Sequence, residues 1–270
     1  MSRNFREHKP ISSLLDFLKA IERMRSFVPM TERRGDDDSV WFRGQHNIDW
    51  PLTPKLFRPE FDGANEAEIR DLFQSRAIQL LHGRQPTDKW EWYFLMQHHG
   101  APTRLLDWTE NPLVALYFAV KNHHTKNDAV VWLLAPFWLN FQNSYLKRQG
   151  IAGPILPTWR EADKYLFDLE TAFSGDSVRM KFPAAIEAPH VDLRLHAQAS
   201  RFVVFGKERD LSRTFEIQPK YFGLGRIRIP YANVKSIENS LANLGIHAAS
   251  IFPDVEGLGE FTCDQWRNRS

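Results

Sequence analysis

QHHGAPTRLLDWTENPLVALYFAV, residues 97–120, is the stretch of this chain that says most about its fold. It combines two histidines, a glycine, two prolines and a threonine, with Arg104 and Asp107 three residues apart. A turn-rich passage of this kind, lying between two helical patterns, is typical of a functional site on a rigid domain. The structural alternative is a loop whose polar groups satisfy one another, with Arg43 or Arg104 as the ion-pair partner of Asp107.

Two predicted helix ends lie within this stretch. An aromatic-rich helix over residues 89–99 ends at Gly100, because glycine adopts the left-handed conformation that ends helices. His98 and His99 lie at its C-terminus, where the helix dipole favours a protonated imidazole that can contact phosphate or carboxylate. Asn111, followed by a proline, predicts the N-cap of the next helix, whose free N–H groups form an anion site.

Helix and strand patterns continue along the rest of the chain. Apolar residues at helical spacing predict helices, and short β-prone runs bounded by turn residues predict strands. The sequence therefore predicts a mixed α/β (α+β) fold with a central, mostly antiparallel sheet flanked by helices. The predicted helices cover residues 14–21, 66–81, 112–123 and 233–244, and the predicted strands cover residues 40–45, 130–134, 201–205, 215–218, 225–230 and 246–252.

One large domain accounts for most of the 270 residues, of which 43% are hydrophobic. A chain of this size and composition can bury a large core. We expect an N-terminal helical segment over residues 1–39, a main domain over residues 40–261 and a C-terminal tail over residues 262–270. Weak periodicity and frequent turn residues over about residues 138–195 predict an insert, or middle lobe, that lies over the core.

Charge and cysteine content exclude several classes of protein. The 35 basic and 33 acidic residues nearly cancel, so no global charge favours a nucleic acid or a membrane surface. Cys263 is the single cysteine, which suits a reducing compartment. The first residues lack the apolar region of a secretory signal, and no stretch is long and apolar enough to span a membrane. We therefore expect a cytoplasmic protein with no membrane partner.

Five motifs resemble, in order, those of the FRG-domain family, which is named after its Phe-Arg-Gly motif. They are WFRGQ at residues 41–45, HHGAPTRLLDWT at residues 98–109, Asn111-Pro112 with Ala115, Ala197-Gln198 before Phe202, and Phe252-Pro253-Asp254 with Gly257-Leu258. The sequence departs from the family at Ala199-Ser200, where relatives more often have a Gln-Gly-like pair. The family is mostly bacterial and cytoplasmic, so the resemblance implies a bacterial protein in a regulatory, defence or toxin setting.

A second resemblance is to ADP-ribosyltransferases of the Arg-Ser-Glu class, in which an aromatic-Arg-Gly element, a Ser or Thr element and a late Glu occur in that order. It implies a catalytic set of Arg43, Thr109 and Glu256, with Glu110 or Glu216 as substitutes for Glu256. An arginine can hold a phosphate of NAD, and a carboxylate can stabilise the sugar cation and deprotonate the acceptor. The implied function is NAD-dependent ADP-ribosyl transfer to a nucleic acid or protein, or NAD hydrolysis.

This resemblance also implies a metal-independent site that takes NAD as its substrate, in an ADP-ribosyltransferase-like fold. We expect a cleft between the strand end at Arg43, residues 97–111 and the turn at Asp254. No phosphate loop, dinucleotide fingerprint or serine-hydrolase elbow occurs in the sequence. The expected NAD-binding residues are Arg43, Gly44, Gln45, His98, His99, Arg104, Asp107 and Asn111.

Two other functions stay open. A non-catalytic module could bind a nucleic acid or nucleotide through the basic strands between Arg194 and Arg228, a range that contains eight basic and three acidic residues. A metal-dependent nuclease could use Asp107, Glu110 and Asp254, although no recognised metal-ligand spacing supports a metal site.

Overall fold

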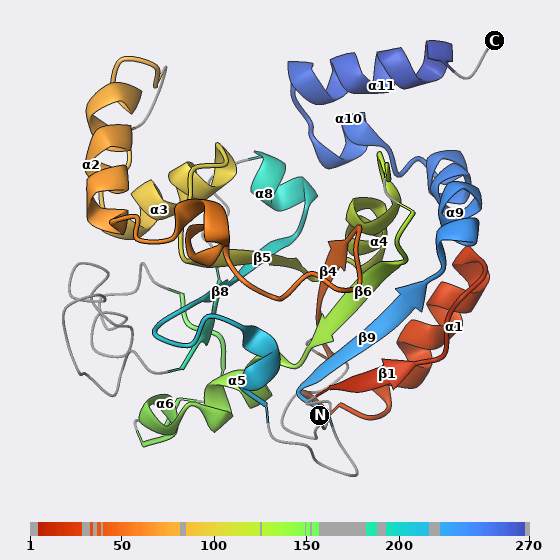
Figure 1. Ribbon diagram of the computed structural model, residues 1–270, viewed down its shortest axis with the longest axis horizontal. Helices are drawn as coiled ribbons and strands as arrows, with labels where there is room; N and C mark the ends of the chain where they lie inside the picture. The colour runs from red at the N-terminus through yellow and green to blue at the C-terminus, as the bar shows by residue number, and fades with distance from the viewer. Residues whose placement is uncertain are drawn as a thin grey trace.

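The fold is described from a computed structural model of the chain (Figure 1). The described residues are 5–28, 33–34, 37–38, 40–81, 85–124, 126–148, 150–151, 153–156, 182–187, 193–215 and 222–267. A seven-stranded open sheet runs through this part of the chain, and helices pack against its faces and edges.

The sheet has the strand order β1-β9-β6-β4-β5-β8-β7. Among the described strands, β1 and β9 pair in parallel and the other neighbours in this sheet are antiparallel. The predicted mixed α/β fold with a mostly antiparallel sheet is therefore confirmed. The strands are β1 (Arg6–His8), β4 (Trp41–Gln45), β5 (Leu105–Thr109), β6 (Ala129–Leu134), β7 (Ala184–Glu187), β8 (Ser200–Val204) and β9 (Leu224–Ile229), and a separate ribbon pairs β2 (Arg33–Arg34) with β3 (Asp37–Asp38).

Strands β6 and β9 show how the pattern of residues sets their place in the sheet. Every residue of β6 is buried, as expected for a strand that is covered on both faces. In β9, the buried residues Ile227 and Ile229 alternate with Arg226 and Arg228, so one face of this strand is polar, as the alternation predicts.

Side-chain caps begin most of the longer helices. Ser13, Asn65, Asp88 and Asn111 each accept a hydrogen bond from a main-chain N–H in the first turn that follows. None of the described helices is long and apolar enough to cross a bilayer. The helices are α1 (Leu14–Arg25), α2 (Glu66–Ala77), α3 (Lys89–His98), α4 (Pro112–Val120), α5 (Pro136–Gln142), α6 (Ser144–Arg148), α8 (Leu193–Ala197), α9 (Tyr231–Asn243), α10 (Ala248–Ile251) and α11 (Val255–Arg267), with 3-10 turns η2 (Lys55–Phe57), η3 (Pro59–Phe61) and η5 (Leu211–Arg213).

Three apolar cores hold the sheet and helices together. One core joins α1, α4 and α9 to inward-facing residues of the central strands, such as Phe42 and Ile227. A second core lies on the opposite face of the sheet, where Trp41 and Trp132 pack near α5. A third core packs α3 against β8, with Phe94 among its residues. The central strands are therefore buried from both sides, which fixes the strand ends that form the site.

The prediction of a strand over residues 246–252 is wrong, because helix α10 occupies most of this segment. Its four residues start behind His247, whose N–H donates to the hydroxyl of Ser250 in a reciprocal cap. By periodicity alone, a short apolar run of this kind is compatible with either a strand or a buried helical turn. The reciprocal cap stabilises the helical turn here. Residues 216–218 of another predicted strand lie outside the described residues.

The predicted insert over residues 138–195 is described only in part, because residues 157–181 and 188–192 lie outside the described residues. In the described part, β7 pairs with β8 and extends the sheet by one strand. At the other end of the chain, α11 runs from Val255 to Arg267 without a break at residue 262. It lies beyond α10, away from the sheet (Figure 1).

Candidate active site

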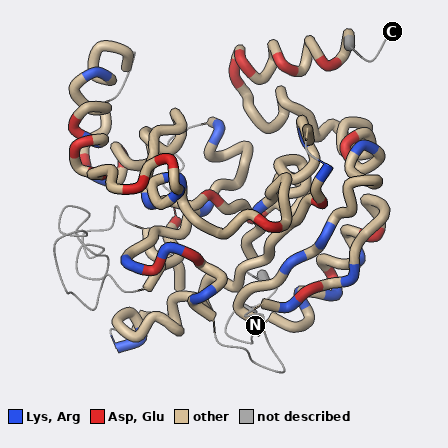
Figure 2. The backbone as a smooth tube through the Cα atoms, in the orientation of Figure 1, with Lys and Arg blue, Asp and Glu red and all other residues tan. Residues whose placement is uncertain are grey.

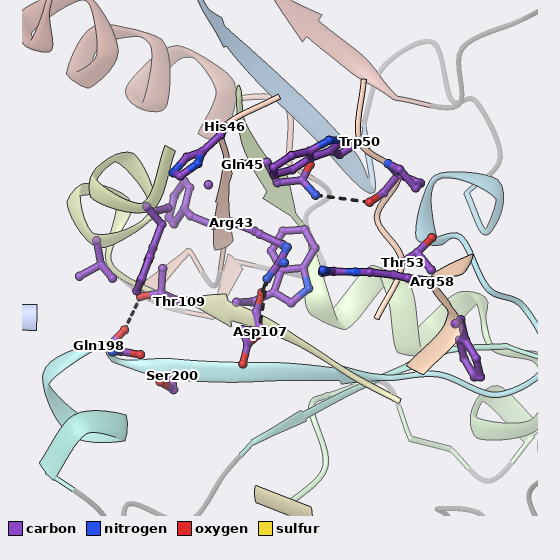
Figure 3. Close-up of a pocket in the computed structure, with 18 of the residues that line it drawn as sticks. Arg43, Gln45, His46, Trp50, Thr53, Arg58, Asp107, Thr109, Gln198 and Ser200 are labelled. Atoms are coloured by element: carbon purple, nitrogen blue, oxygen red, sulfur yellow. Dashed lines mark hydrogen bonds and ion pairs between the residues drawn. The ribbon is translucent and has the colours of Figure 1, made fainter. Parts of the chain in front are cut away.

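A pocket of about 760 Å³ opens where β4 and β5 diverge. The two strands pair at Phe42 and Thr109, and the pocket lies beside this point. Its walls come from the end of β4, the segment from His46 to Glu60, residues 107–109 of β5, the first two turns of α4, and Gln198 with Ser200 (Figure 3). We call it the Arg43 pocket.

Gly44 allows α4 to form one wall of the pocket. A Cβ atom at this position would lie 1.9 Å from the main-chain oxygen of Ala115 and 2.6 Å from the nitrogen of Ala119. Both distances are far inside van der Waals contact, so only glycine lets the helix pack this closely on the strand. The glycine of the Phe-Arg-Gly motif is therefore required for packing.

Gln45 fixes the direction of the chain as it leaves β4. Its side chain is buried, and its Oε1 accepts a hydrogen bond of 2.8 Å from Nε1 of Trp132. Its Nε2 donates to the main-chain oxygen of Pro51 at 3.3 Å. These two bonds hold the following segment against the sheet, where it forms the outer wall of the pocket.

Arg43 and Asp107 meet at the centre of the pocket (Figure 3). Nη1 of Arg43 donates to the main-chain oxygen of Asp107 at 2.7 Å and lies 3.7 Å from its carboxylate. Burial lowers the pKa of Arg43, although the charge of Asp107 opposes this effect. Nε of Arg43 is buried without a hydrogen-bond partner in the described chain. The pair suggested by the sequence between these two residues is confirmed.

The carboxylate of Asp107 is held by a second contact from outside the pocket. Nε2 of Gln97 donates to Oδ2 of Asp107 at 2.8 Å, and Oε1 of Gln97 accepts from the hydroxyl of Thr103. The side chain of Asp107 is still 55% exposed. A carboxylate that is both held in place and open to the pocket can accept a proton or face a cationic group.

The hydroxyl of Thr109 is engaged in the structure. It donates to the main-chain oxygen of Gln198 at 2.5 Å and accepts from the N–H of Asn111 at 3.0 Å. Gln198 in turn donates from Nε2 to the oxygen of Ile251 at 3.3 Å. Thr109 lines the pocket, but these contacts show that it joins β5, α4 and the chain before β8. Gln198, which also lines the pocket, is therefore held in place by contacts with Thr109 and Ile251.

Arg104 forms an ion pair away from the pocket. Its Nε donates to Oε2 of Glu66 at 2.6 Å, and its main-chain N–H donates to Oε1 of the same residue at 3.0 Å. Both side chains are at most 1% exposed. The residue thus ties α2 to the start of β5, with Glu66 rather than Asp107 as its ion-pair partner. His98 and His99 lie at the C-terminus of α3, and neither lines the pocket.

Three further sequence-predicted residues, all within the described part of the chain, lie outside the pocket wall. Glu110 forms an ion pair with Arg201 at 2.9 Å. Oδ1 of Asn111 accepts from the N–H of Leu113, which occupies part of the expected anion site. Glu256 is exposed in the first turn of α11 and does not line the pocket. Glu216, the other substitute, lies outside the described residues.

Sequence reasoning missed the segment between residues 46 and 60. It contributes Trp50 and Arg58 to the pocket, and Arg58 points toward Arg43 and Asp107 (Figure 3). The exposed side chain of Glu60 lies on the same segment and supplies the second carboxylate of the described wall. Three prolines interrupt the periodicity of this segment, so the one available signal was the combination of aromatic and basic residues.

The basic strands are largely neutralised by acidic partners. Arg226 pairs with Glu7 at 3.0 Å, and Arg228 pairs with Asp128. Strand β1, which carries a basic and an acidic position, runs beside the basic positions of β9 (Figure 2). This arrangement does not favour the nucleic-acid-binding alternative, which needs unpaired cations facing phosphates.

The proposed nuclease residues have other partners. Glu110 contacts Arg201, whereas Asp254 lies 3.8 Å from Nε of Arg194 and accepts from the N–H of Gly257. In the part of the chain that the structure describes, no three His, Cys, Asp or Glu side chains gather where they could hold a metal ion. The wall of the pocket contains two arginines, two carboxylates and several aromatic rings.

A comparison with protein families finds a match to the FRG domain. The model of the FRG domain matches residues 38–128, which include β4, the segment from His46 to Glu60, β5 and α4. No curated protein and no solved structure matches the chain. The matched range supplies most of the wall of the Arg43 pocket, including both members of the Arg43 and Asp107 pair. The chain therefore contains an FRG domain over residues 38–128.

Proposed function

We propose that the FRG domain binds NAD in the Arg43 pocket and breaks its bond between nicotinamide and ribose, with transfer of ADP-ribose to water or to a macromolecular acceptor. The observation that carries this proposal is the meeting of Arg43 with the exposed carboxylate of Asp107 in one pocket. A volume of about 760 Å³ lies in the range that takes cofactor-sized ligands.

The two residues supply the two functions that this chemistry needs. A guanidinium is always charged and can form paired hydrogen bonds with a phosphate. A carboxylate stabilises the positive charge that develops on a sugar when its leaving group departs, and it can remove a proton from the incoming hydroxyl. Arg43 would hold the substrate, and Asp107 would face the ribose.

The reaction balances without a metal or an oxidant. The bond between C1′ of the ribose and the nicotinamide nitrogen breaks, and its electron pair leaves with nicotinamide. An oxygen of water or of the acceptor forms the new bond to C1′. Its proton passes to the carboxylate of Asp107 and then to solvent.

Asp107 takes the role that the resemblance gives to Glu256. Glu256 is exposed on α11 and outside the pocket wall, whereas Asp107 is held by Gln97 beside Arg43. Thr109 supports this geometry through Gln198, since its hydroxyl proton is directed to a main-chain oxygen.

Release of nicotinamide from NAD tests this function. Asp107→Asn is expected to keep the fold and to reduce the rate by about 100-fold or more, as the loss of a general base does. Glu256→Gln is the matched control, because it neutralises an exposed carboxylate outside the pocket, and it is expected to keep the wild-type rate. A wild-type protein that releases no nicotinamide with water, protein or nucleic acid as acceptor would rule the function out.

A further inference from the structure

Arg58 is a second arginine of the pocket that no motif of the sequence singles out. It lies between η2 and η3, and its main-chain N–H donates to the main-chain oxygen of Lys55 at 3.2 Å. Two hydrogen bonds anchor the same segment to the turn before β5. The N–H of Leu56 donates to the main-chain oxygen of Thr103 at 3.2 Å, and Nζ of Lys55 donates to the main-chain oxygen of Gly100 at 2.6 Å. The backbone that carries Arg58 is therefore fixed relative to β5.

The side chain of Arg58 extends across the pocket toward Arg43 and Asp107 (Figure 3). Its charge is near enough to contribute to the lowered pKa of Arg43, in addition to the larger effect of burial. Two guanidinium groups thus approach one carboxylate. Like charges at close range repel each other, and an anion between them would relieve this repulsion.

The carboxylates of the described chain leave donor groups of both guanidinium groups without an ion-pair partner at hydrogen-bond distance. Arg43 is 3.7 Å from Asp107, and its buried Nε has no hydrogen-bond partner there. Among the described residues, Arg58 has no ion-pair partner within 4.0 Å. Glu60, the other carboxylate of the pocket wall, is exposed. Two guanidinium groups therefore face the single carboxylate of Asp107 at the centre of the pocket, and Nε of Arg43 is available as a donor.

We propose that Arg43 and Arg58 together bind the diphosphate group of the substrate, which makes Arg58 a determinant of specificity for dinucleotides. This inference rests on the proposed function and deepens it. Two neighbouring phosphates, each singly charged, match two guanidinium groups that face the same space. With Arg43 engaged by phosphate, Asp107 remains held by Gln97 and keeps its carboxylate directed to the pocket.

Calorimetric titration of the full chain with ADP-ribose, inorganic pyrophosphate and adenosine tests the proposal. Adenosine carries no phosphate, so it controls for contacts with the base and ribose. Arg58→Gln is expected to weaken the affinity for ADP-ribose and for pyrophosphate by about tenfold or more, and to leave the affinity for adenosine unchanged. Arg58→Lys is expected to restore part of the affinity, because it keeps the charge and loses the paired hydrogen bonds. Arg148→Gln removes an exposed arginine of α6 outside the pocket and is expected to change none of the three.

The outcomes separate this inference from the proposed function. Equal affinity of the wild type and Arg58→Gln for ADP-ribose and pyrophosphate overturns the inference, and so does release of nicotinamide by a protein that binds neither ligand. Binding that depends on Arg58, in a protein that leaves NAD intact, supports the diphosphate site and refutes the hydrolytic function. Thermal melting of each variant confirms that the compared proteins are folded.

Discussion

Nη1 of Arg43 donates a hydrogen bond of 2.7 Å to the main-chain oxygen of Asp107, across the gap where β4 and β5 diverge. The same contact brings the guanidinium within 3.7 Å of the Asp107 carboxylate. One arginine therefore both joins two strands and contributes charge to the pocket. Because these roles are combined, variants of Arg43 need a stability measurement beside every binding or rate measurement.

Thr109 is expected to act as a structural residue. Thr109→Val removes the hydroxyl that bonds Gln198 and Asn111, and we expect a loss of about 1–3 kcal/mol in the free energy of unfolding. At a temperature where the variant is folded, nicotinamide release is expected to stay within a few-fold of wild type. Thr109→Ser keeps the hydroxyl and serves as the control. A folded Thr109→Val protein without activity would instead assign Thr109 a direct role in the reaction.

Gly44 is expected to tolerate no side chain. Gly44→Ala places a Cβ 1.9 Å from a main-chain oxygen of α4, so the helix has to move, and we expect a loss of about 3 kcal/mol or more in stability. Gly259→Ala is the matched control, since an added Cβ there meets no atom within 4 Å, and alanine in this helix is expected to stabilise by about 1 kcal/mol. Denaturant unfolding measures both. Similar stability for the two variants would contradict the close packing.

The buried pair of Arg104 and Glu66 is expected to hold α2 in place. Arg104→Met leaves an unpaired carboxylate in the core, and we expect a loss of about 3–5 kcal/mol in the free energy of unfolding. Lys235→Gln is the comparison, because it breaks an exposed pair with Glu238 and is expected to cost less than about 1 kcal/mol. Equal effects in urea unfolding would show that the Arg104 pair contributes no more than a surface contact.

His46 is expected to make the protein less stable in acid. Burial, followed by the charge of His123, lowers the pKa of His46 below its ordinary value of 6.5. The folded state then binds fewer protons than the unfolded state as the pH falls below 6.5, so stability is present above that value and is lost on acidification. The effect is small because His46 is only half-buried. His46→Asn is expected to reduce the fall in melting temperature between about pH 7.5 and about pH 5, and an unchanged fall would contradict this assignment.

The sequence predicts the regular elements well where capping residues and apolar spacing agree. Ser13, Asn65, Asp88 and Asn111 begin helices that the spacing also predicts, and the alternation in β9 places Arg226 and Arg228 on a polar face. Local chemistry decides these features, so one sequence is enough to find them.

The sequence did not predict the contacts between residues that lie far apart along the chain. Arg104 pairs with a glutamate 38 residues away, and Arg58 reaches the pocket from a proline-rich segment without periodicity. The order of Arg43, Thr109 and Glu256 along the chain agrees with the Arg-Ser-Glu pattern, yet Glu256 lies outside the pocket wall. Order in sequence gives no distance, and the pocket depends on which strand ends meet in the sheet.

Calorimetric titration of the wild type and of Arg43→Gln with NAD tests the central claim, which is that the Arg43 pocket is an NAD site. We predict saturable binding of one NAD per chain by the wild type, and affinity at least about tenfold weaker for a folded Arg43→Gln variant. No binding of NAD by the wild type, or equal affinity of the two folded proteins, would contradict the account.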